Sequence, residues 1–175
     1  MRVAVGTARI AFIGESHTLK IPRIYPIEGT KQLIRVAKEG ISIIKRELKY
    51  HIDAPGTFKY LLLRGIQENR REYRLSQRLQ GLVVPTRFSF LGIFNIQATA
   101  KPHNLTVKEL YDGVVKKLGS NIWKDNHLFT DVNNFGIYKG QLKLIDYGGI
   151  KSEEFLLEYR RLIGESLDEL SKVLE

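Results

Sequence analysis

Residues 123–149 read WKDNHLFTDVNNFGIYKGQLKLIDYGG, and this stretch decides how the rest of the chain is interpreted. Short apolar runs on either side of Lys139-Gly140-Gln141 predict two strands joined by a tight turn, which is a β-hairpin. Side chains with oxygen atoms stand at the two ends of this hairpin: Asp131, Asn133 and Asn134 before it and Asp146 after it. The hairpin therefore gathers polar groups at its base.

Two interpretations of these polar residues are open. Antiparallel pairing brings the residue before the first strand beside the residue after the second, so we expect Asn134 and Asp146 to lie side by side. Carboxylate and amide oxygens in that arrangement suit Mg²⁺ carrying a phosphate. Asn, Asp and Gly also cluster at hairpin ends because they form turns, so the same residues fit an ordinary turn.

Composition narrows the class of protein. The chain has 175 residues, 43% of them apolar, which predicts one domain with a real core or two small lobes. The absence of cysteine excludes disulfides, thiolate metal sites and a cysteine nucleophile. No apolar run approaches the roughly 20 residues of a spanning helix, so no membrane contact and a cytoplasmic protein are expected. A net charge of +9 favours polyanions or an acidic protein surface as partners.

Period-two patterns predict an N-terminal sheet. The expected strands are two within 2–13 around Gly6-Thr7-Ala8, one at 17–21, and two apolar runs within 87–101, separated at Leu91-Gly92, that form either a hairpin or two strands with a bend. Lys20 stands between two apolar residues of its strand, and on pattern alone we expect it to face solvent.

Helical periodicity predicts helices over 30–51, 65–80, 106–119 and 152–175. The first is amphipathic and basic, which suits a core-facing helix with a solvated side or contact with nucleic acid, a membrane surface or a protein. Glu72 lies in the second, among four arginines, where its simplest role is an exposed helical ion pair. The order of elements predicts an α+β fold with an N-terminal sheet and a helical C-terminal part.

With Lys20, Glu72, Asn134 and Asp146 placed in this order, the chain resembles the protein-kinase-like fold. LKLIDYGG (142–149) is similar to the kinase segment whose Asp-Phe-Gly holds magnesium, here Asp146-Tyr147-Gly148. NNFGIYKGQLKL (133–144) is similar to the hairpin before it, which is entered by the metal-binding Asn of the catalytic loop.

Three upstream segments carry the rest of the resemblance. HTLKIP (17–22) resembles the strand whose lysine grips the α- and β-phosphates. ENRREYRL (68–75) resembles the helix whose glutamate pairs with that lysine, and Glu72 fits this role. GTARIAF (6–12) resembles a remnant of the glycine loop, which implies that Gly6 and Thr7 contact the nucleotide.

The resemblance covers residues 3–149 and implies a minimal two-lobe kinase-like domain, of the small kind found in bacteria and their viruses. Residues 1–101 are expected to form the N-terminal lobe with a helical insert over 24–64, and 102–175 a reduced, truncated C-terminal lobe. It also implies ATP and Mg²⁺ as cofactors. The residues expected at the nucleotide are Gly6, Thr7, Lys20 and Glu72, and those at the metal are Asn134 and Asp146.

The catalytic loop departs from the kinase pattern His-x-Asp-x-x-x-x-Asn. Counting back from Asn134 puts its histidine at His127 but its aspartate at Phe129, which cannot accept a proton. Alternatively, two residues are deleted before Asn134 and Asp131 is the catalytic base. We favour this alignment because an apolar residue then follows the aspartate, as in kinases; Asp125 is a third candidate.

Two further departures concern the substrate. An insert separates Lys20 from the Glu72 helix, and only residues 149–175 follow Gly148, where an ordinary kinase has its activation segment and most of its substrate lobe.

The leading hypothesis is a kinase that transfers the γ-phosphate of ATP to a protein or small-molecule hydroxyl. A pseudokinase-like module that holds or inhibits a partner is the alternative, and an acidic protein docking on the basic helices is an expected partner. A basic nucleic-acid-binding protein built on helices 30–50 and 65–80 is the third.

Overall fold

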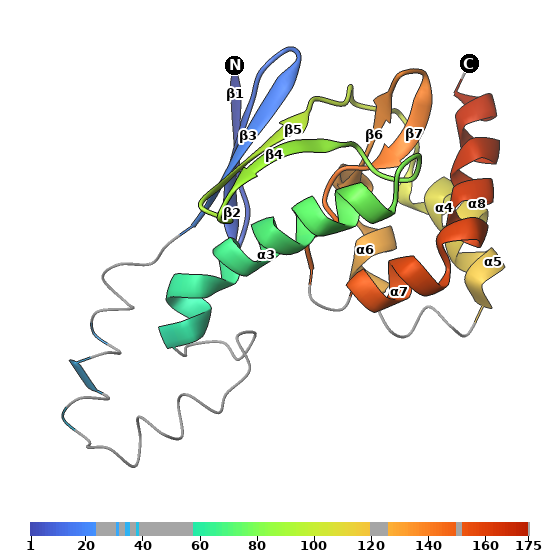
Figure 1. Cartoon of the computed structure of the whole chain (residues 1–175). Helices are drawn as coiled ribbons and strands as arrows, with labels where there is room; N and C mark the ends of the chain where they lie inside the picture. Colours follow the sequence, from blue (N-terminus) through green and yellow to red (C-terminus); the bar gives the residue numbers. More distant parts are fainter. Residues whose placement is uncertain are drawn as a thin grey trace.

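The computed structural model describes residues 1–23, 31, 34, 35, 38, 58–119, 126–149 and 152–174. Their fold is α+β, as the sequence predicts, with an antiparallel sheet at the N-terminal end and a small sheet and helices at the C-terminal end (Figure 1). The basic helix expected over 30–51 lies outside these residues except for four isolated positions. Within the described ranges, no helix combines the length and the apolar character needed to cross a membrane.

The larger sheet has five strands in the order β1-β2-β3-β5-β4, and every pairing is antiparallel. The strands are β1 (Arg2–Val5), β2 (Arg9–Ile13), β3 (His17–Pro22), β4 (Thr86–Phe90) and β5 (Phe94–Ala98). The strands expected from the sequence are therefore all present. The chain returns to the sheet after a long helix, and β5 then pairs with β3.

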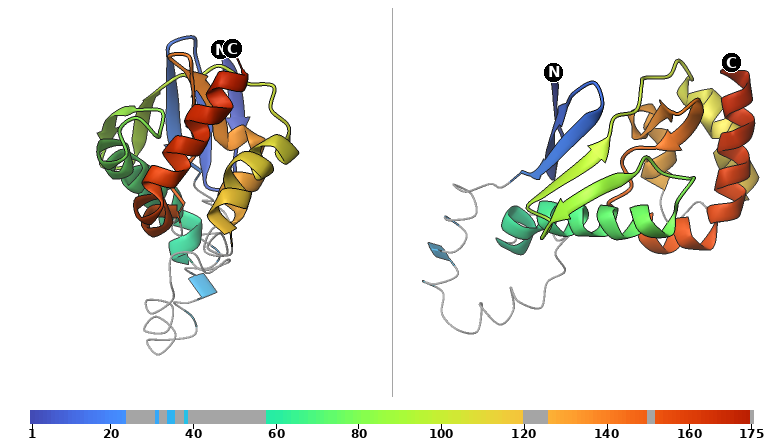
Figure 2. Two further views of the ribbon diagram at one scale, coloured as in Figure 1. Left: turned by 90° about the vertical axis from the view of Figure 1, so that its right-hand side faces the viewer. Right: turned by 45° about the horizontal axis from the view of Figure 1, so that its top comes forward.

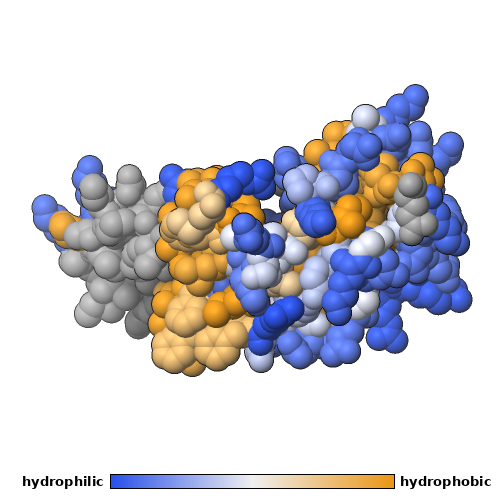
Figure 3. All heavy atoms as spheres, turned by 90° about the horizontal axis from the view of Figure 1, so that it is seen from above, coloured by the Kyte–Doolittle hydropathy of each residue, from blue (hydrophilic) through white to orange (hydrophobic). Residues whose placement is uncertain are grey.

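The outer face of this sheet is apolar. Directly paired residues share a face, and the register places one apolar row across all strands: Val3, Phe12, Leu19, Ile96 and Phe88. The two ends of the row, Val3 and Phe88, are 51% and 47% exposed. Figure 3 shows apolar side chains gathered at the sheet end of the molecule.

The inner face of the sheet is polar. The row next to the apolar one contains Lys20 and Asn95, which are 4% and 0% exposed. The expectation that Lys20 faces solvent is therefore wrong, and Leu19 is the exposed neighbour. Lys20 points inward because an acidic side chain of the helix below compensates its charge.

That helix, α3 (Phe58–Arg78), begins well before the expected residue 65. It passes beneath the sheet and continues to the helical end of the molecule (Figure 2). Gly65 lies inside the helix at its closest approach to the sheet. A Cβ at this position would stand 2.8 Å from the Cβ of Pro22 and would collide with the carbonyl of Ala8.

The helical part begins with a continuous stretch made of α4 (Val107–Leu110), a π-helical turn η1 (Tyr111–Val115) and α5 (Lys116–Leu118). This is the helix expected over 106–119, and Thr106 and Glu109 form a capping box at its start. The helix expected over 152–175 is instead two: α7 (Ser152–Glu158) and α8 (Arg160–Val173). They are separated at Tyr159, where ψ of 14° departs from helical geometry.

Between these helices lie α6 (Asn126–Thr130), the 3₁₀ turn η3 (Val132–Asn134) and the hairpin of β6 (Phe135–Tyr138) and β7 (Gln141–Leu144). The hairpin closes through Lys139 (φ 54°) and Gly140 (φ 78°), the two positive φ angles of a type I′ turn. The turn predicted from the sequence is confirmed.

The apolar core lies in the helical part of the molecule. It is one cluster of buried residues drawn from the C-terminal end of α3, from the helices that follow and from the β6–β7 hairpin, and among the described residues none before Leu75 belongs to it. Backbone bridges join this part to the sheet: Lys101 and Ile137 exchange two hydrogen bonds (2.9 and 2.8 Å), and Val84 donates to Leu144 (2.8 Å).

We predict that Gly65→Ala lowers the free energy of unfolding by roughly 1–3 kcal/mol, because the added methyl group overpacks the contact between α3 and the sheet. Gly164→Ala in α8 is the matched control, since a Cβ there meets no atom within 4 Å. It should raise stability by about 0.5–1 kcal/mol, as alanine does in a helix. Urea unfolding of both variants measures the difference, and equal stabilities would contradict the close approach at Gly65.

Candidate functional site

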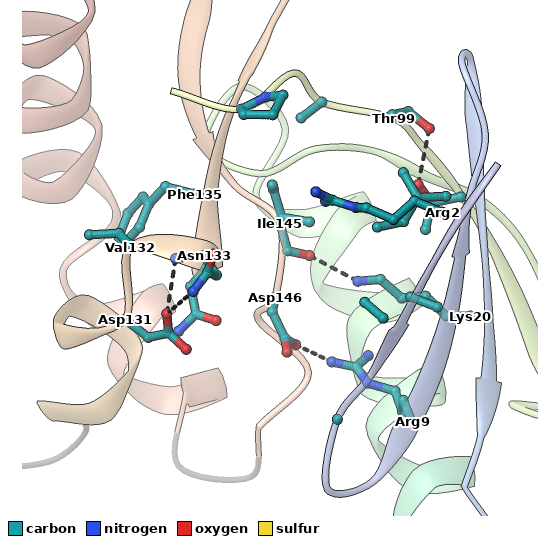
Figure 4. Close-up of a pocket in the computed structure, with 18 of the residues that line it drawn as sticks. Arg2, Arg9, Lys20, Thr99, Asp131, Val132, Asn133, Phe135, Ile145 and Asp146 are labelled. Atoms are coloured by element: carbon teal, nitrogen blue, oxygen red, sulfur yellow. Dashed lines mark hydrogen bonds and ion pairs between the residues drawn. The ribbon is translucent and has the colours of Figure 1, made fainter. Parts of the chain in front are cut away.

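A cavity of about 700 Å³ opens between the inner face of the sheet and the base of the β6–β7 hairpin (Figure 4). This volume is in the range of small-molecule sites. Most of the candidate site residues line it: Gly6, Thr7, Lys20, Asp131, Asn134 and Asp146. Glu72 lies behind this lining in contact with Lys20. The fold thus brings together residues that are far apart in the sequence.

Lys20 and Glu72 form a buried ion pair. The Nζ of Lys20 donates to Oε2 of Glu72 (2.7 Å) and to the carbonyl of Ile145 (3.0 Å). Burial lowers the pKa of Lys20, although the negative charge of Glu72 opposes this shift. Glu72 has no exposed surface, so the exposed helical ion pair expected for it is wrong.

Arg9 was not predicted, and it occupies the centre of the site. Its Nη1 donates to Oε2 of Glu72 (2.5 Å), its Nη2 donates to Oδ1 of Asp146, and its Nε lies 3.5 Å from Oε2 of Glu68. Arg9 is 7% exposed. One signal could have found it together with the resemblance that places Lys20 at the phosphates, because alternation along β2 puts Arg9 on the face that carries Lys20 on the neighbouring strand.

Asp146 is the most accessible carboxylate of this network. Its side chain is 54% exposed, against 0% for Glu72 and 10% for Glu68. Desolvation acts to raise its pKa, but the positive charges of Arg9 and Lys20 outweigh this and lower the pKa of Asp146 below its ordinary value. Asp146 is therefore ionised at neutral pH.

Asn134 and Asp146 both line the cavity at the base of the hairpin, but the strand pairing does not set them directly opposite each other. The residue directly opposite Asn134 is Ile145, whose backbone nitrogen donates to the carbonyl of Asn134 (2.7 Å), and Asp146 is the next residue along the chain. The amide nitrogen of Asn134 donates to the carbonyl of Leu128 (3.0 Å), so a cation would be bound through its amide oxygen. No group of three or more His, Cys, Asp or Glu side chains that could hold a metal occurs among the described residues.

These oxygen atoms are of the type that Mg²⁺ binds, and the cavity beside them has room for phosphates. The donor set thus fits a magnesium-bound phosphate in its chemistry. The charge of Asp146 is, however, already balanced by Arg9.

Asp131 is the carboxylate of the preceding loop that reaches the cavity. Its Oδ1 accepts hydrogen bonds from the backbone and side-chain nitrogens of Asn133 (both 2.9 Å), so Asp131 caps η3. Phe129 is 1% exposed and packs against Phe135 and Phe155 in the core. Of the other residues considered for this loop, His127 is part of α6 and Asp125 lies outside the described residues.

The turn at Gly6-Thr7 forms one edge of the cavity. It is closed by a hydrogen bond from the backbone nitrogen of Gly6 to the carbonyl of Arg9 (2.8 Å). The backbone of the turn is therefore tied directly to the residue that holds Asp146.

The arginines around Glu72 on α3 make contacts within the molecule. Arg71 donates to the carbonyl of Gly148 (3.1 Å), and Arg70 donates to that of Leu91 (2.7 Å). Arg74 lies 3.4 Å from the carboxylate of Glu153 on α7, and Arg78 lies 3.9 Å from it. The basic face of α3 is thus partly neutralised by the helical part.

Comparisons of the chain with models of protein families, with curated proteins and with solved structures find no match.

We predict that Glu72→Gln lowers the free energy of unfolding by roughly 3–5 kcal/mol, because it leaves the buried charges of Lys20 and Arg9 short of their shared partner. Glu165→Gln is the control. It breaks an exposed pair with Arg161 (3.9 Å) and should change stability by less than about 0.5 kcal/mol. Chemical denaturation followed by circular dichroism measures the free energy of unfolding of both variants. A loss for Glu72→Gln no larger than that for Glu165→Gln would contradict the role of Glu72 as the shared partner of two buried cations.

Proposed function

We propose that the protein binds a nucleoside triphosphate such as ATP in the cavity and transfers its γ-phosphate to a hydroxyl group, in the manner of a small kinase. One observation carries this proposal. Lys20 paired with Glu72, the oxygen-bearing side chains of Asn134 and Asp146, and Asp131 converge on one cavity from separate parts of the chain. Phosphoryl transfer requires little covalent help from a protein, and positioned charges of this kind supply most of the catalysis.

Each residue has a distinct role in this proposal. Lys20 binds the phosphates, and Glu72 holds the ammonium group in place. The backbone of the Gly6-Thr7 turn covers the phosphates from the edge of the sheet. Bound Mg²⁺ would neutralise phosphate charge, and Asn134 and Asp146 would hold it through their oxygens.

Asp131 orients the acceptor hydroxyl and accepts its proton. Oδ1 of Asp131 is engaged by both hydrogen bonds from Asn133, so Oδ2 is the oxygen that would meet the hydroxyl. A carboxylate that accepts a proton from the attacking hydroxyl is the general base of kinase chemistry. The acceptor is a small molecule or a protein side chain that reaches this end of the cavity.

A nucleotide-binding protein without turnover, similar to a pseudokinase, is the second candidate. The structure favours it at two points: Asp146 is paired with Arg9, and Asp131 caps a turn of its own loop. A nucleic-acid-binding protein is supported less, because the arginines of α3 contact Glu153 and backbone carbonyls. Nucleotide binding is common to the first two candidates, so it is tested first.

We predict that ATP with Mg²⁺ raises the free energy of unfolding of the wild type, by about 2.7 kcal/mol when the nucleotide is at a hundred times its Kd. Lys20→Met should lose most of this increment because the phosphates lose their cation. Lys117→Met removes a lysine that pairs with Glu169 outside the cavity and should keep the increment. The increment is measured for each variant with and without ligand, and no increment in the wild type at millimolar nucleotide would contradict the proposal.

If the protein is a kinase, Asp131→Asn should lower kcat by about a hundredfold or more, as loss of a general base does. Nucleotide affinity should change little, since Asp131 acts on the acceptor. Release of phosphate and autophosphorylation are the measurements. An active wild type with an unaffected Asp131→Asn variant would remove Asp131 from the mechanism, and an inactive wild type that binds ATP would favour the second candidate.

A further inference from the structure

Arg9 connects helix α3 and the hairpin base through its guanidinium, as Lys20 does through its ammonium group. Its terminal nitrogens pair with Glu72 on one side and Asp146 on the other, and its Nε lies near Glu68. In Figure 4 its side chain extends from β2 to the carboxylate of Asp146. Arg9 therefore holds the position where a cation would approach Asp146 from the sheet side.

We propose that Arg9 and a divalent cation are alternative partners of Asp146, so that Arg9 sets how much the site depends on a metal ion. The proposal deepens the function given above and rests on it for its biological meaning. Its physical content, competition for one carboxylate, can be tested with a metal ion alone.

The exposure of the three carboxylates identifies Asp146 as the place of exchange. Glu72 is fully buried and Glu68 nearly so, whereas more than half of the Asp146 side chain meets solvent. A hydrated ion from solution can reach Asp146 without dismantling the interface between the sheet and α3. The other two carboxylates stay with the protein's own cations.

The other partners of Arg9 keep the free-energy cost of replacing it by a metal ion at Asp146 small. Besides Asp146, the guanidinium contacts Glu72 (2.5 Å) and Glu68 (3.5 Å), so Arg9 would still have acidic partners after it releases Asp146. A cation on Asp146 with Arg9 still in place would be repelled by the guanidinium, and the two cannot share the carboxylate favourably. The metal ion and Arg9 are thus exclusive at Asp146.

The replacement of Arg9 by a metal ion also affects the Gly6-Thr7 turn at the edge of the cavity. Gly6 donates its backbone N–H to the carbonyl of Arg9, and Gly6 and Thr7 line the cavity. Release of Asp146 by Arg9 therefore loosens the hold between this edge of the sheet and the hairpin. A nucleotide that brings a metal ion would therefore displace Arg9 from Asp146 as the ion binds.

The test measures Mn²⁺ binding to the full chain by electron paramagnetic resonance, without nucleotide. The wild type should bind Mn²⁺ weakly, and Arg9→Gln should bind it about tenfold more tightly or better, which corresponds to ~1.4 kcal/mol. The double variant Arg9→Gln, Asp146→Asn should lose this binding. Arg74→Gln removes the same charge from an exposed position on α3 and should behave like the wild type.

Equal Mn²⁺ affinity in the wild type and Arg9→Gln, absence of binding in both, or binding that survives in the double variant would each overturn the proposal. None of these outcomes depends on nucleotide binding, and failure to bind ATP would leave the metal result unaffected. If Arg9→Gln does not fold, the wild type is titrated with Mg²⁺ and the Nε–H resonance of Arg9 is followed by NMR. It should shift together with the carboxyl carbon of Asp146, and a stationary Arg9 resonance would overturn the proposal.

Discussion

The carboxylate of Glu72 accepts hydrogen bonds from two cations, Lys20 on β3 and Arg9 on β2, and none of these side chains is more than slightly exposed. This contact and the hydrogen bond between Asn69 and Asn95 hold the sheet to α3, because the apolar core lies elsewhere. A buried ion pair adds little net stability compared with apolar packing, but removing one partner is costly. The network therefore specifies where the sheet sits more than it strengthens the attachment.

The parts of the fold that depend on local pattern could be predicted from the sequence. The β6–β7 hairpin and its turn at Lys139-Gly140 follow from strand periodicity and turn chemistry. The predicted pairing of Asn134 with Asp146 is off by one residue, because Ile145 stands opposite Asn134. The contact between Lys20 and Glu72 was expected only from the resemblance to kinases. Spacing along the chain contains no information about which helix meets which strand.

The faces of the sheet could not be predicted, because alternation shows that a strand has two sides but not which one is covered. The usual assignment of apolar residues to the interior fails here, since Leu19 is turned outward and Lys20 inward. Arg9 was missed for the same reason: a charged residue at the start of a strand is normally solvated. Lys20 and Arg9 are buried because carboxylates of α3 and of the hairpin base pair with them. These contacts form only in the folded chain, so the local sequence pattern does not reveal them.

The β6–β7 hairpin is joined by backbone hydrogen bonds on both of its edges, to Lys101 on one side and to residues 82–84 on the other. The segments that enter and leave the β4–β5 hairpin are thus fastened to the helical part at two separate places. A hinge motion about the linker after β5 would have to break both fastenings. We therefore expect the cavity to change its width where β1 and β2 line it, by twisting of these two strands, while the wall formed by the base of the β6–β7 hairpin stays rigid.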